Sequence, residues 1–347
     1  MSEMRVRNYA SAISEALCEA MDRDKDIFVT GIAADYKSGL FGSTTEVIER
    51  FAPDRIFDAP SMENAMAGIA IGAAAVGKRP VILHPRADFM FLALDQMINL
   101  ASKWRYMYDG NAGSVPVVMR GVIGRGWGQG ATHSQSIQSV VAHFPGINVI
   151  MPTFADDAKG LMMTALKVDT PTIILEHRLL FNIEAEVPEG EYYVPFGKAR
   201  IVTEGTDVTV VTSSFMTIEA QVAIEALKES GVSVELIDIR SIRPLDTKTI
   251  IESVKKTGRL VVADTSWAFC GVSAEILAVV SESAFSALKA PPIRIGLADV
   301  PAPVSKPLED AFYPKASDIA RAISTLMNAK DKDFEGVEFV HDFKGPY

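Results

Sequence analysis

Short runs rich in β-branched residues alternate with longer helical patterns along almost the whole chain, and this alternation constrains the fold more than any other feature. Strands that are separated by helices pair in parallel, because each helix carries the chain back along the sheet. Several runs, such as VVMR at 117–120 and TIILE at 172–176, are apolar on both faces, as in a sheet covered on both sides. The sequence therefore predicts an α/β fold of doubly wound sheets.

The individual elements follow from the same pattern. Strands are expected at residues 27–30, 80–83, 115–120, 149–151, 172–176, 207–212, 233–239, 259–264 and 293–296. Helices are expected at residues 8–21, 62–76, 88–107, 155–168, 216–229, 246–256, 271–287 and 315–328. The helix after Asp246 is the best marked, because Asp246 can cap its start and Gly258 can close its end.

The length of 347 residues suggests two domains at roughly 100–200 residues each. Residues 183–197 are acidic, contain two prolines and two glycines and show no apolar period, which is typical of a linker. We therefore expect a first domain over residues 1–185, a linker over 186–198 and a second domain over 199–330. Residues 331–347 are expected to form a C-terminal arm.

Charge and composition argue against several classes of function. The net charge of −10 disfavours binding to nucleic acid or to an anionic membrane surface. The start of the chain has no signal core, and the longest apolar stretch, 65–77, is too short to cross a membrane and is expected to be a buried helix. Two cysteines, Cys18 and Cys270, give neither a disulfide framework nor metal-ligand spacing, so a cytoplasmic location is expected.

Glu63 is the first candidate for chemistry. It lies in PSMENAMAG, where Ser61 resembles a helix cap and Glu63 falls in the first turn. One interpretation is a solvated carboxylate that complements the helix dipole. The other is a buried acid at the mouth of a helix that is apolar all round, and a buried acid needs a partner or a task.

His133 is the second candidate, within GRGWGQGATHSQ. The alternating glycines of this stretch permit a close backbone approach to a ligand, but their spacing matches neither the dinucleotide fingerprint nor a P-loop. A histidine after such a loop can act as a general acid or base, or it can be a hydrogen-bonded loop residue. Spacing alone favours neither.

His84 and Arg86 follow the expected strand at 80–83, at the edge where doubly wound folds bind ligands. Arg86 suits an anionic substrate group, and the alternative is an ion pair with Asp88 or Asp35. The residues alone therefore indicate a two-domain α/β protein with a candidate site near Glu63, Arg86 and His133.

Eight segments, taken in order, resemble a known family. In the first half they are PSMENAMAGIAIGAAAVGKRPV, DFMFLALDQMINLASKWRYMYDG, GRGWGQGATHSQS and HFPGINVIMPTFADDAKGL. In the second half they are GTDVTVVT, IDIRSIRPLD, SVKKTGRLVVAD and APPIRIGLADVPAP. Their joint order, over about residues 5–325, resembles the beta subunit of the decarboxylating component of 2-oxo acid dehydrogenases, the pyruvate, branched-chain and acetoin enzymes. The fold is shared with the middle and last domains of transketolase.

The resemblance implies a pyrimidine-binding domain of a thiamine-diphosphate enzyme followed by a transketolase C-terminal domain. Glu63 matches the glutamate that hydrogen-bonds the aminopyrimidine ring, where a desolvated carboxyl favours the imino tautomer that removes the thiazolium proton. His133 matches the family's active-site histidine, near the substrate and the lipoyl acceptor. Phe89 is expected to be a second contact of the cofactor.

The resemblance also implies a partner. Chains that bind the diphosphate carry Gly-Asp-Gly, which holds magnesium with a later Asn, and this sequence has no Gly-Asp-Gly. An alpha subunit should therefore supply the diphosphate and magnesium site, in an α2β2 heterotetramer with the cofactor between the two kinds of chain.

The sequence departs from the family at two places that bear on ligands. Arg86, with His84 beside it, stands before the Asp-Phe pair where a phenylalanine usually leans towards the cofactor, so both are expected to contact substrate. In the loop at 165–171, Val168 replaces the aspartate of relatives that bind potassium, so no metal site is predicted, although backbone carbonyls could still bind the ion.

Three functions compete. The first is a subunit that decarboxylates a 2-oxo acid and passes the acyl group to lipoamide, with a lipoyl acyltransferase as a further partner. The second is a split transketolase-like enzyme that transfers a two-carbon or acyl unit to an aldehyde or a sugar, which Arg86 and His84 favour mildly. The third is a non-catalytic partner, and the presence of both Glu63 and His133 argues against it.

Overall fold

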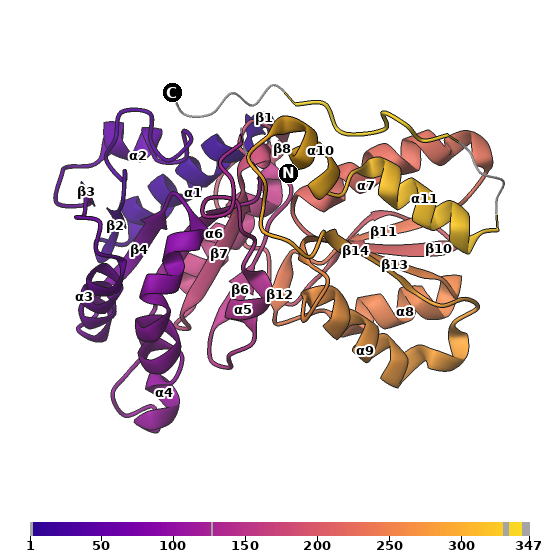
Figure 1. Ribbon diagram of the computed structural model, residues 1–347. Helices are drawn as coiled ribbons and strands as arrows, with labels where there is room; N and C mark the ends of the chain where they lie inside the picture. Colours follow the sequence, from indigo (N-terminus) through magenta and orange to yellow (C-terminus); the bar gives the residue numbers. More distant parts are fainter. Residues whose placement is uncertain (1–2, 126–127, 329–332, 342–347) are drawn as a thin grey trace.

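The computed structural model describes residues 3–125, 128–328 and 333–341. Two mostly parallel sheets lie side by side, and helices cover both faces of each (Figure 1). The predicted α/β class with doubly wound sheets is therefore confirmed.

The first sheet has the strand order β12-β6-β7-β5-β4-β2-β3. All neighbouring strands are parallel except the edge pair β12 and β6. The edge strand β12 comes from the second half of the sequence, so the two halves share this sheet. The strands are β2 (Ile27–Gly31), β3 (Ile56–Asp58), β4 (Arg79–His84), β5 (Val118–Ile123), β6 (Asn148–Ile150), β7 (Thr172–His177) and β12 (Ser241–Arg243).

Helices bury apolar side chains on both faces of this sheet. One face is covered by α1 (Tyr9–Arg23) and α6 (Ala155–Lys167), with the short α2 (Thr45–Arg50) against α1. The other face is covered by α3 (Glu63–Ala75), η1 (Ala87–Ala93) and η2 (Asp95–Ala101). The single helix expected at 88–107 is wrong, because this stretch is a 3₁₀ helix, a π-helix and the short α4 (Trp104–Met107). No Pro or Gly marks these breaks.

The second sheet has the order β14-β13-β10-β11-β9, with β9 antiparallel. As predicted, Asp246 accepts a hydrogen bond from the Thr249 amide at 3.1 Å, and Gly258 closes the following helix at a φ of 78°. One face carries α7 and α11, the other α8 and α9 (Figure 1). The elements are β9 (Arg200–Thr203), β10 (Val208–Thr212), β11 (Val234–Asp238), β13 (Leu260–Trp267), β14 (Ile293–Leu297), α7 (Phe215–Leu227), α8 (Thr247–Thr257), α9 (Val272–Ala284), α10 (Lys306–Phe312) and α11 (Ala316–Leu326).

The residues expected to be a linker lie against the first half of the chain. β8 (Glu184–Pro188) overlaps this stretch and forms a two-stranded ribbon with β1 (Met4–Asn8). Further on, the Tyr192 hydroxyl donates to the Asp156 carbonyl at 2.7 Å. The linker at 186–198 is therefore not a free tether, and the exact domain limits remain a sequence-based prediction.

The two halves share one packed junction. A single apolar cluster contains Met119 of the first sheet and Val262 of the second. Polar contacts add to it: Gln138 on α5 (Gln138–Ala142) donates to the Asp264 carboxylate at 2.6 Å. Burial raises the pKa of Asp264 to about 6. The site described below is thus built between two halves held by both apolar and polar contacts.

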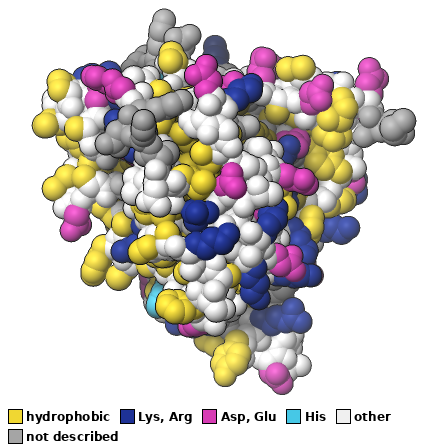
Figure 2. All heavy atoms as spheres, turned by 90° about the vertical axis from the view of Figure 1, so that its right-hand side faces the viewer, with side chains coloured by type: hydrophobic (Ala, Val, Ile, Leu, Met, Phe, Trp, Pro, Cys, Tyr) yellow, Lys and Arg dark blue, Asp and Glu magenta, His cyan; other side chains and the backbone are white. Residues whose placement is uncertain are grey.

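The surface carries charges of both signs. Figure 2 shows Lys and Arg side chains grouped near the middle of the face formed by the second half, with Asp and Glu around them. The net charge of −10 is therefore not evenly spread. Within the described residues, no helix combines the length and apolar character that a membrane crossing requires.

Candidate active site

Glu63 is the first residue of α3, at the end of the connection from β3. The position before it is Met62, and no side chain caps the helix, so the expectation that Ser61 is the cap is wrong. Glu63 is only 8% exposed. Its carboxylate has no hydrogen bond or ion pair to any residue that the structure describes. The low exposure favours the buried acid at the helix mouth over the solvated carboxylate, and the role of Glu63 stays a prediction.

The outer face of α3 is open to solvent. Ala67, Ala70 and Ile71 are buried against the sheet, but Ile69 is 72% exposed and Val76, just beyond the helix end, is 80% exposed. The expectation of a buried helix is therefore wrong for the single chain. A helix that is apolar all round and exposed on one side is typical of an interface for another chain.

Phe89 and His133 meet beside the end of β4. Phe89 lies on η1, and its ring packs edge-on against the His133 imidazole, with centroids 5.4 Å apart and planes at 84°. Thr132 Oγ1 lies 2.9 Å from His133 Nδ1 and orients the ring. The structure thus joins two of the predicted site residues. Among the described residues, no hydrogen bond, ion pair or ring contact joins Glu63 to either of them.

His84 and Arg86 differ in access. His84, the last residue of β4, is 1% exposed, and burial lowers its pKa to about 4, so the imidazole is neutral at pH 7. Arg86 is half-buried and donates to the Pro85 carbonyl at 2.7 Å. The alternative partner Asp88 accepts a hydrogen bond from the Gln135 side chain at 2.9 Å. His84 is thus covered by the chain, whereas Arg86 is partly exposed at the strand end.

Two further arginines lie at the same sheet edge, and the sequence analysis missed them. Arg125 follows the end of β5 by two residues, and Arg178 directly follows β7. β7, β5 and β4 are neighbours, so Arg86, Arg125 and Arg178 sit at the carboxyl ends of three adjacent parallel strands. Strand ends and basic residues were both visible in the sequence, but the strand order that brings them together was not.

Arg178 holds the glycine-rich stretch that carries His133. Its guanidinium is fully buried and donates to the Gln129 side chain and, at 2.8 Å, to the His133 carbonyl. Burial, with the nearby charge of Arg86, lowers the pKa of Arg178 to about 9. A second anchor is Glu309 on α10, which accepts a hydrogen bond from the Gly128 amide at 3.4 Å. Residues 126 and 127 of this stretch lie outside the described residues.

Gly124 is the first residue of the glycine-rich stretch, and no residue with a side chain fits at this position. Its φ is +80°, and a Cβ there would lie 2.0 Å from the His177 imidazole. His177 in turn stacks on Phe215 of the second half, with ring centroids 4.8 Å apart. The start of the loop is therefore packed directly onto the junction between the two halves.

The loop at 165–171 makes contacts with an arginine. Arg79 donates to the carbonyls of Leu166, Lys167 and Val168 at 2.8–3.0 Å. These bonds cap the carboxyl end of α6 with a positive charge.

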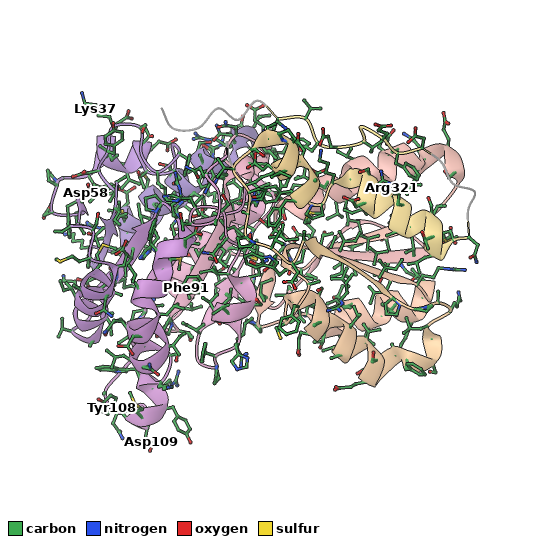
Figure 3. The ribbon with its side chains drawn as sticks, viewed as in Figure 1. Lys37, Asp58, Phe91, Tyr108, Asp109 and Arg321 are labelled. Atoms are coloured by element: carbon green, nitrogen blue, oxygen red, sulfur yellow. The ribbon has the colours of Figure 1, made fainter. Side chains whose placement is uncertain are left out.

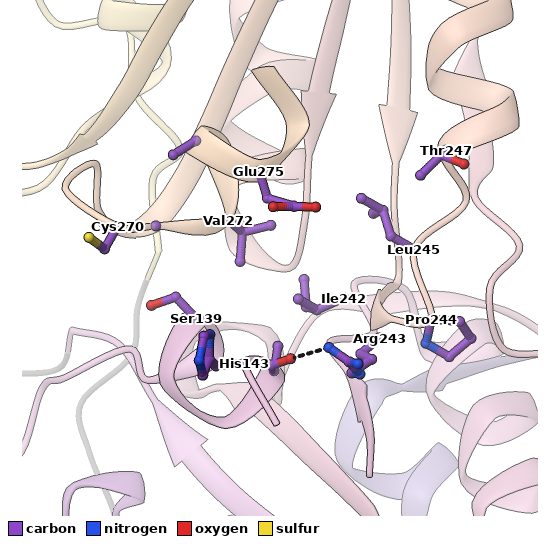
Figure 4. Close-up of a pocket in the computed structure, with 13 residues that line it drawn as sticks. Ser139, His143, Ile242, Arg243, Pro244, Leu245, Thr247, Cys270, Val272 and Glu275 are labelled. Atoms are coloured by element: carbon purple, nitrogen blue, oxygen red, sulfur yellow. Dashed lines mark hydrogen bonds between the residues drawn. The ribbon is translucent and has the colours of Figure 1, made fainter. Parts of the chain in front are cut away.

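A cavity of about 690 Å³ lies at the junction, between α5, the end of β12 and the start of α9. Arg243 in its wall donates to the Ala142 carbonyl at 2.9 Å, and His143, Cys270 and Glu275 line it (Figure 4). None of the predicted site residues lines this cavity. It is a separate feature from the strand-end site.

Two family descriptions match the chain. Residues 6–183 match the transketolase pyrimidine binding domain, and residues 197–319 match the transketolase C-terminal domain. A split-gene transketolase, solved as an inactive beta4 tetramer, superposes with a TM-score of 0.75 over 92% of this chain and 98% of that one. At 24% identity, that likeness shows the fold alone.

Closer relatives are beta subunits. The acetoin:2,6-dichlorophenolindophenol oxidoreductase subunit beta of Cupriavidus necator is 40% identical over 325 residues, covering 91% of this chain and 96% of that protein. The pyruvate dehydrogenase E1 component subunit beta of Rickettsia felis is 40% identical over 315 residues, with the same coverage. The mitochondrial subunit beta-1 of Arabidopsis thaliana is 42% identical over 324 residues, covering 92% of this chain and 88% of that protein. This chain, which joins a transketolase pyrimidine-binding domain to a transketolase C-terminal domain, therefore belongs to the family of the acetoin and pyruvate dehydrogenase beta subunits.

Proposed function

We propose that this chain is the beta subunit of a heteromeric thiamine-diphosphate enzyme that decarboxylates a 2-oxo acid and transfers the acyl group to lipoamide. The single observation that carries the proposal is the Glu63 carboxylate, 8% exposed at the mouth of α3. A carboxylate in that position is costly unless a ligand pairs with it. Relatives that are about 40% identical in sequence are the beta subunits of an acetoin oxidoreductase and of a pyruvate dehydrogenase E1 component.

The residues present fit the pyrimidine half of thiamine diphosphate. Glu63 offers a carboxylate to a ring nitrogen, and Phe89, 38% exposed, offers an aromatic surface. The cofactor, when bound, stabilises negative charge on the substrate's carbonyl carbon. Within this chain, Glu63 would hold a proton at the ring nitrogen, and His133 would accept or donate a proton beside the substrate. His133 is suited to this because Thr132 and Arg178 fix it.

The diphosphate half must come from a partner. We propose an alpha subunit that binds the diphosphate through magnesium, in an α2β2 heterotetramer. Exposed apolar side chains on or beside α3, η1 and α4 support this, although others lie on β1, β3 and α5. Figure 3 shows Tyr108, just after α4, at the far end of this surface, away from the second half. On α3, η1 and α4 the most exposed are Ile69, Leu92 and Tyr106.

The second candidate is a split transketolase-like enzyme that transfers its unit to an aldehyde or sugar. Arg86 favours it, because a half-buried guanidinium at a strand end can hold a phosphate or hydroxyls. Lipoamide and a lipoyl acyltransferase are partners only in the first function. Transfer to lipoamide or to an aldehyde, measured on the same complex, separates the two.

If this chain binds only the pyrimidine half of the cofactor, the isolated chain should bind the cofactor weakly. Without an alpha subunit it should bind thiamine diphosphate with a Kd above about 1 mM, because only the pyrimidine half has contacts here, whereas the complex should bind far more tightly. Calorimetry on the chain alone and on the complex, both with magnesium, measures this. Micromolar binding by the chain alone would show that the diphosphate site has been placed on the wrong subunit.

Arg86 and His84 are proposed to define the substrate. Arg86 would contact it directly, and the buried neutral His84 would support the strand end below it. Arg86→Phe should raise the KM for substrate by about tenfold, the effect of losing one charge-assisted hydrogen bond, while cofactor affinity stays unchanged.

The matched control for Arg86 is Arg321→Phe, at an exposed position on α11 and away from the strand ends. Steady-state kinetics and a thermal melt on the same complexes give the measurement. A lower melting temperature in Arg86→Phe, with KM unaltered for every substrate tried, would assign Arg86 to stability instead.

A cytoplasmic location is also proposed. Both cysteines, buried Cys18 and exposed Cys270, are free thiols, which suits a reducing compartment.

A further inference from the structure

We infer that the C-terminal arm, the described residues 333–341, is a positioning element that fixes the start of the His133 loop through Glu219 and Phe339. Figure 1 shows this segment running along the top of the molecule from the second half towards the first half. The arm lies beyond residues 197–319, which match the family domain. The inference rests on the proposed function only in giving His133 a catalytic task.

The arm is firmly attached to the second half. Phe334 is 3% exposed and belongs to the apolar core around α7 and α11. The Ser317 amide donates to the Val337 carbonyl at 2.9 Å, and Lys315 pairs with Glu338 at 2.5 Å. These contacts fix the position of Phe339.

Glu219 joins the arm to the loop. Its side chain is fully buried on α7, and one carboxylate oxygen accepts hydrogen bonds from the Phe339 amide at 3.1 Å and the Ala316 amide at 3.0 Å. The other oxygen lies 3.8 Å from the guanidinium of Arg125. One buried carboxylate thus contacts the backbone of the arm and the second residue of the loop.

The ring of Phe339 makes a parallel connection. It packs edge-on against Phe215, with centroids 5.8 Å apart. Phe215 carries the Arg125 guanidinium on its ring at 5.8 Å and stacks on His177. The His177 ring fills the space against Gly124 where a side chain would stand. The arm therefore supports both Gly124 and Arg125, the first two residues of the loop.

The far end of the loop is held from the first half. Arg178 donates to the His133 carbonyl, and this contact does not involve the arm. His133 is thus fixed at one end by its own half and at the other through the second half. Removing the arm's contacts should loosen the first anchor and leave the second in place, which displaces His133 without unfolding either sheet.

The test is amide hydrogen exchange on the full chain alone, comparing Phe339→Ala with Val340→Ala. Val340 is adjacent but 84% exposed, so it serves as the matched control. In Phe339→Ala, exchange at Gly124–Arg125 and at Gly128–His133 should speed up about tenfold, as expected for loss of a local anchor. Exchange in β10 and β13 should not change. Phe339→Leu, which keeps an apolar side chain, should restore most of the protection.

The outcomes are decisive without any activity measurement. Unchanged exchange in the loop of Phe339→Ala, or faster exchange equally in β10 and β13, would overturn the inference. Glu219→Gln provides an independent test, because it keeps an acceptor for the Phe339 amide but removes the charge that faces Arg125. Faster amide exchange confined to the loop is again expected. In the complex, Phe339→Ala should lower kcat about tenfold with little change in KM. A wild-type complex that lacks the proposed activity would refute the proposed function and leave the exchange result intact.

Discussion

Replacing Glu63 by Gln should slow exchange of the C2 proton of bound thiamine diphosphate by roughly 30- to 1000-fold in the complex with an alpha subunit. One charged hydrogen bond lost in a dry site costs about 2–4 kcal/mol of activation free energy. The amide keeps the size of the side chain but cannot share a proton with a ring nitrogen. Because Glu63 has no hydrogen bond within the described part of the chain, the substitution removes no contact that holds the fold.

The measurement is quenched-exchange NMR on the reconstituted complex. Assembly and cofactor affinity should stay close to wild type, since the amide still fills the position. The matched control is Glu49→Gln on α2, an exposed glutamate on the same half of the chain. Proton exchange that is equally fast in Glu63→Gln and Glu49→Gln would remove Glu63 from the mechanism.

Strands could be predicted from the sequence wherever the apolar run was local and uninterrupted. β2, β4 and β7 lie within one residue of their expected limits at each end. β5 was expected three residues too early, because the run includes Pro116, which has no amide to donate to a ladder, and the strand begins only at Val118. The same local pattern could not predict β12, a three-residue strand whose partner β6 lies in the other half of the chain.

The residues of the candidate active site also differ in whether a local stretch of sequence could predict them. Glu63 and His133 could be found because each stands in a recognisable stretch of sequence. Arg178 could not, because its importance comes from the hydrogen bond to the His133 carbonyl, 45 residues earlier in the chain. The burial of α3 was misjudged for a related reason: an apolar sequence shows that a face will be covered, but not whether this chain or another covers it.

An ion pair between Arg120 and Glu176 lies at the centre of the first sheet. Of the contacts in that sheet, we expect its loss to lower the stability most. Arg120 Nε and one terminal nitrogen donate to the two carboxylate oxygens at 2.8 and 3.0 Å, and neither side chain is exposed. Ser43 accepts a further hydrogen bond from the guanidinium at 2.8 Å. The two residues lie on the adjacent strands β5 and β7, directly behind the strand ends that carry Arg125 and Arg178.

Arg120→Met should lower the free energy of unfolding by about 3–5 kcal/mol, because it leaves the Glu176 carboxylate buried without a counter-charge. That is a large part of the ~5–15 kcal/mol that separates a folded domain from its unfolded state. Urea denaturation of the full chain, followed by far-ultraviolet circular dichroism, measures the loss. The exposed pair of Lys228 and Glu225 is the matched control, and Lys228→Met should cost less than about 1 kcal/mol.

The double variant Arg120→Met/Glu176→Leu separates two sources of that loss. If the loss of stability comes from a Glu176 carboxylate left without a counter-charge, removing both charges should recover most of the stability, since apolar side chains of similar volume fill such sites well. If the double variant is as unstable as Arg120→Met, the bidentate pair and its bond to Ser43 stabilise the sheet in themselves. Recovery of stability together with a slower reaction in the complex would show why an ion pair is kept here: it orients β5 and β7, and through them the strand ends on which the His133 loop is built.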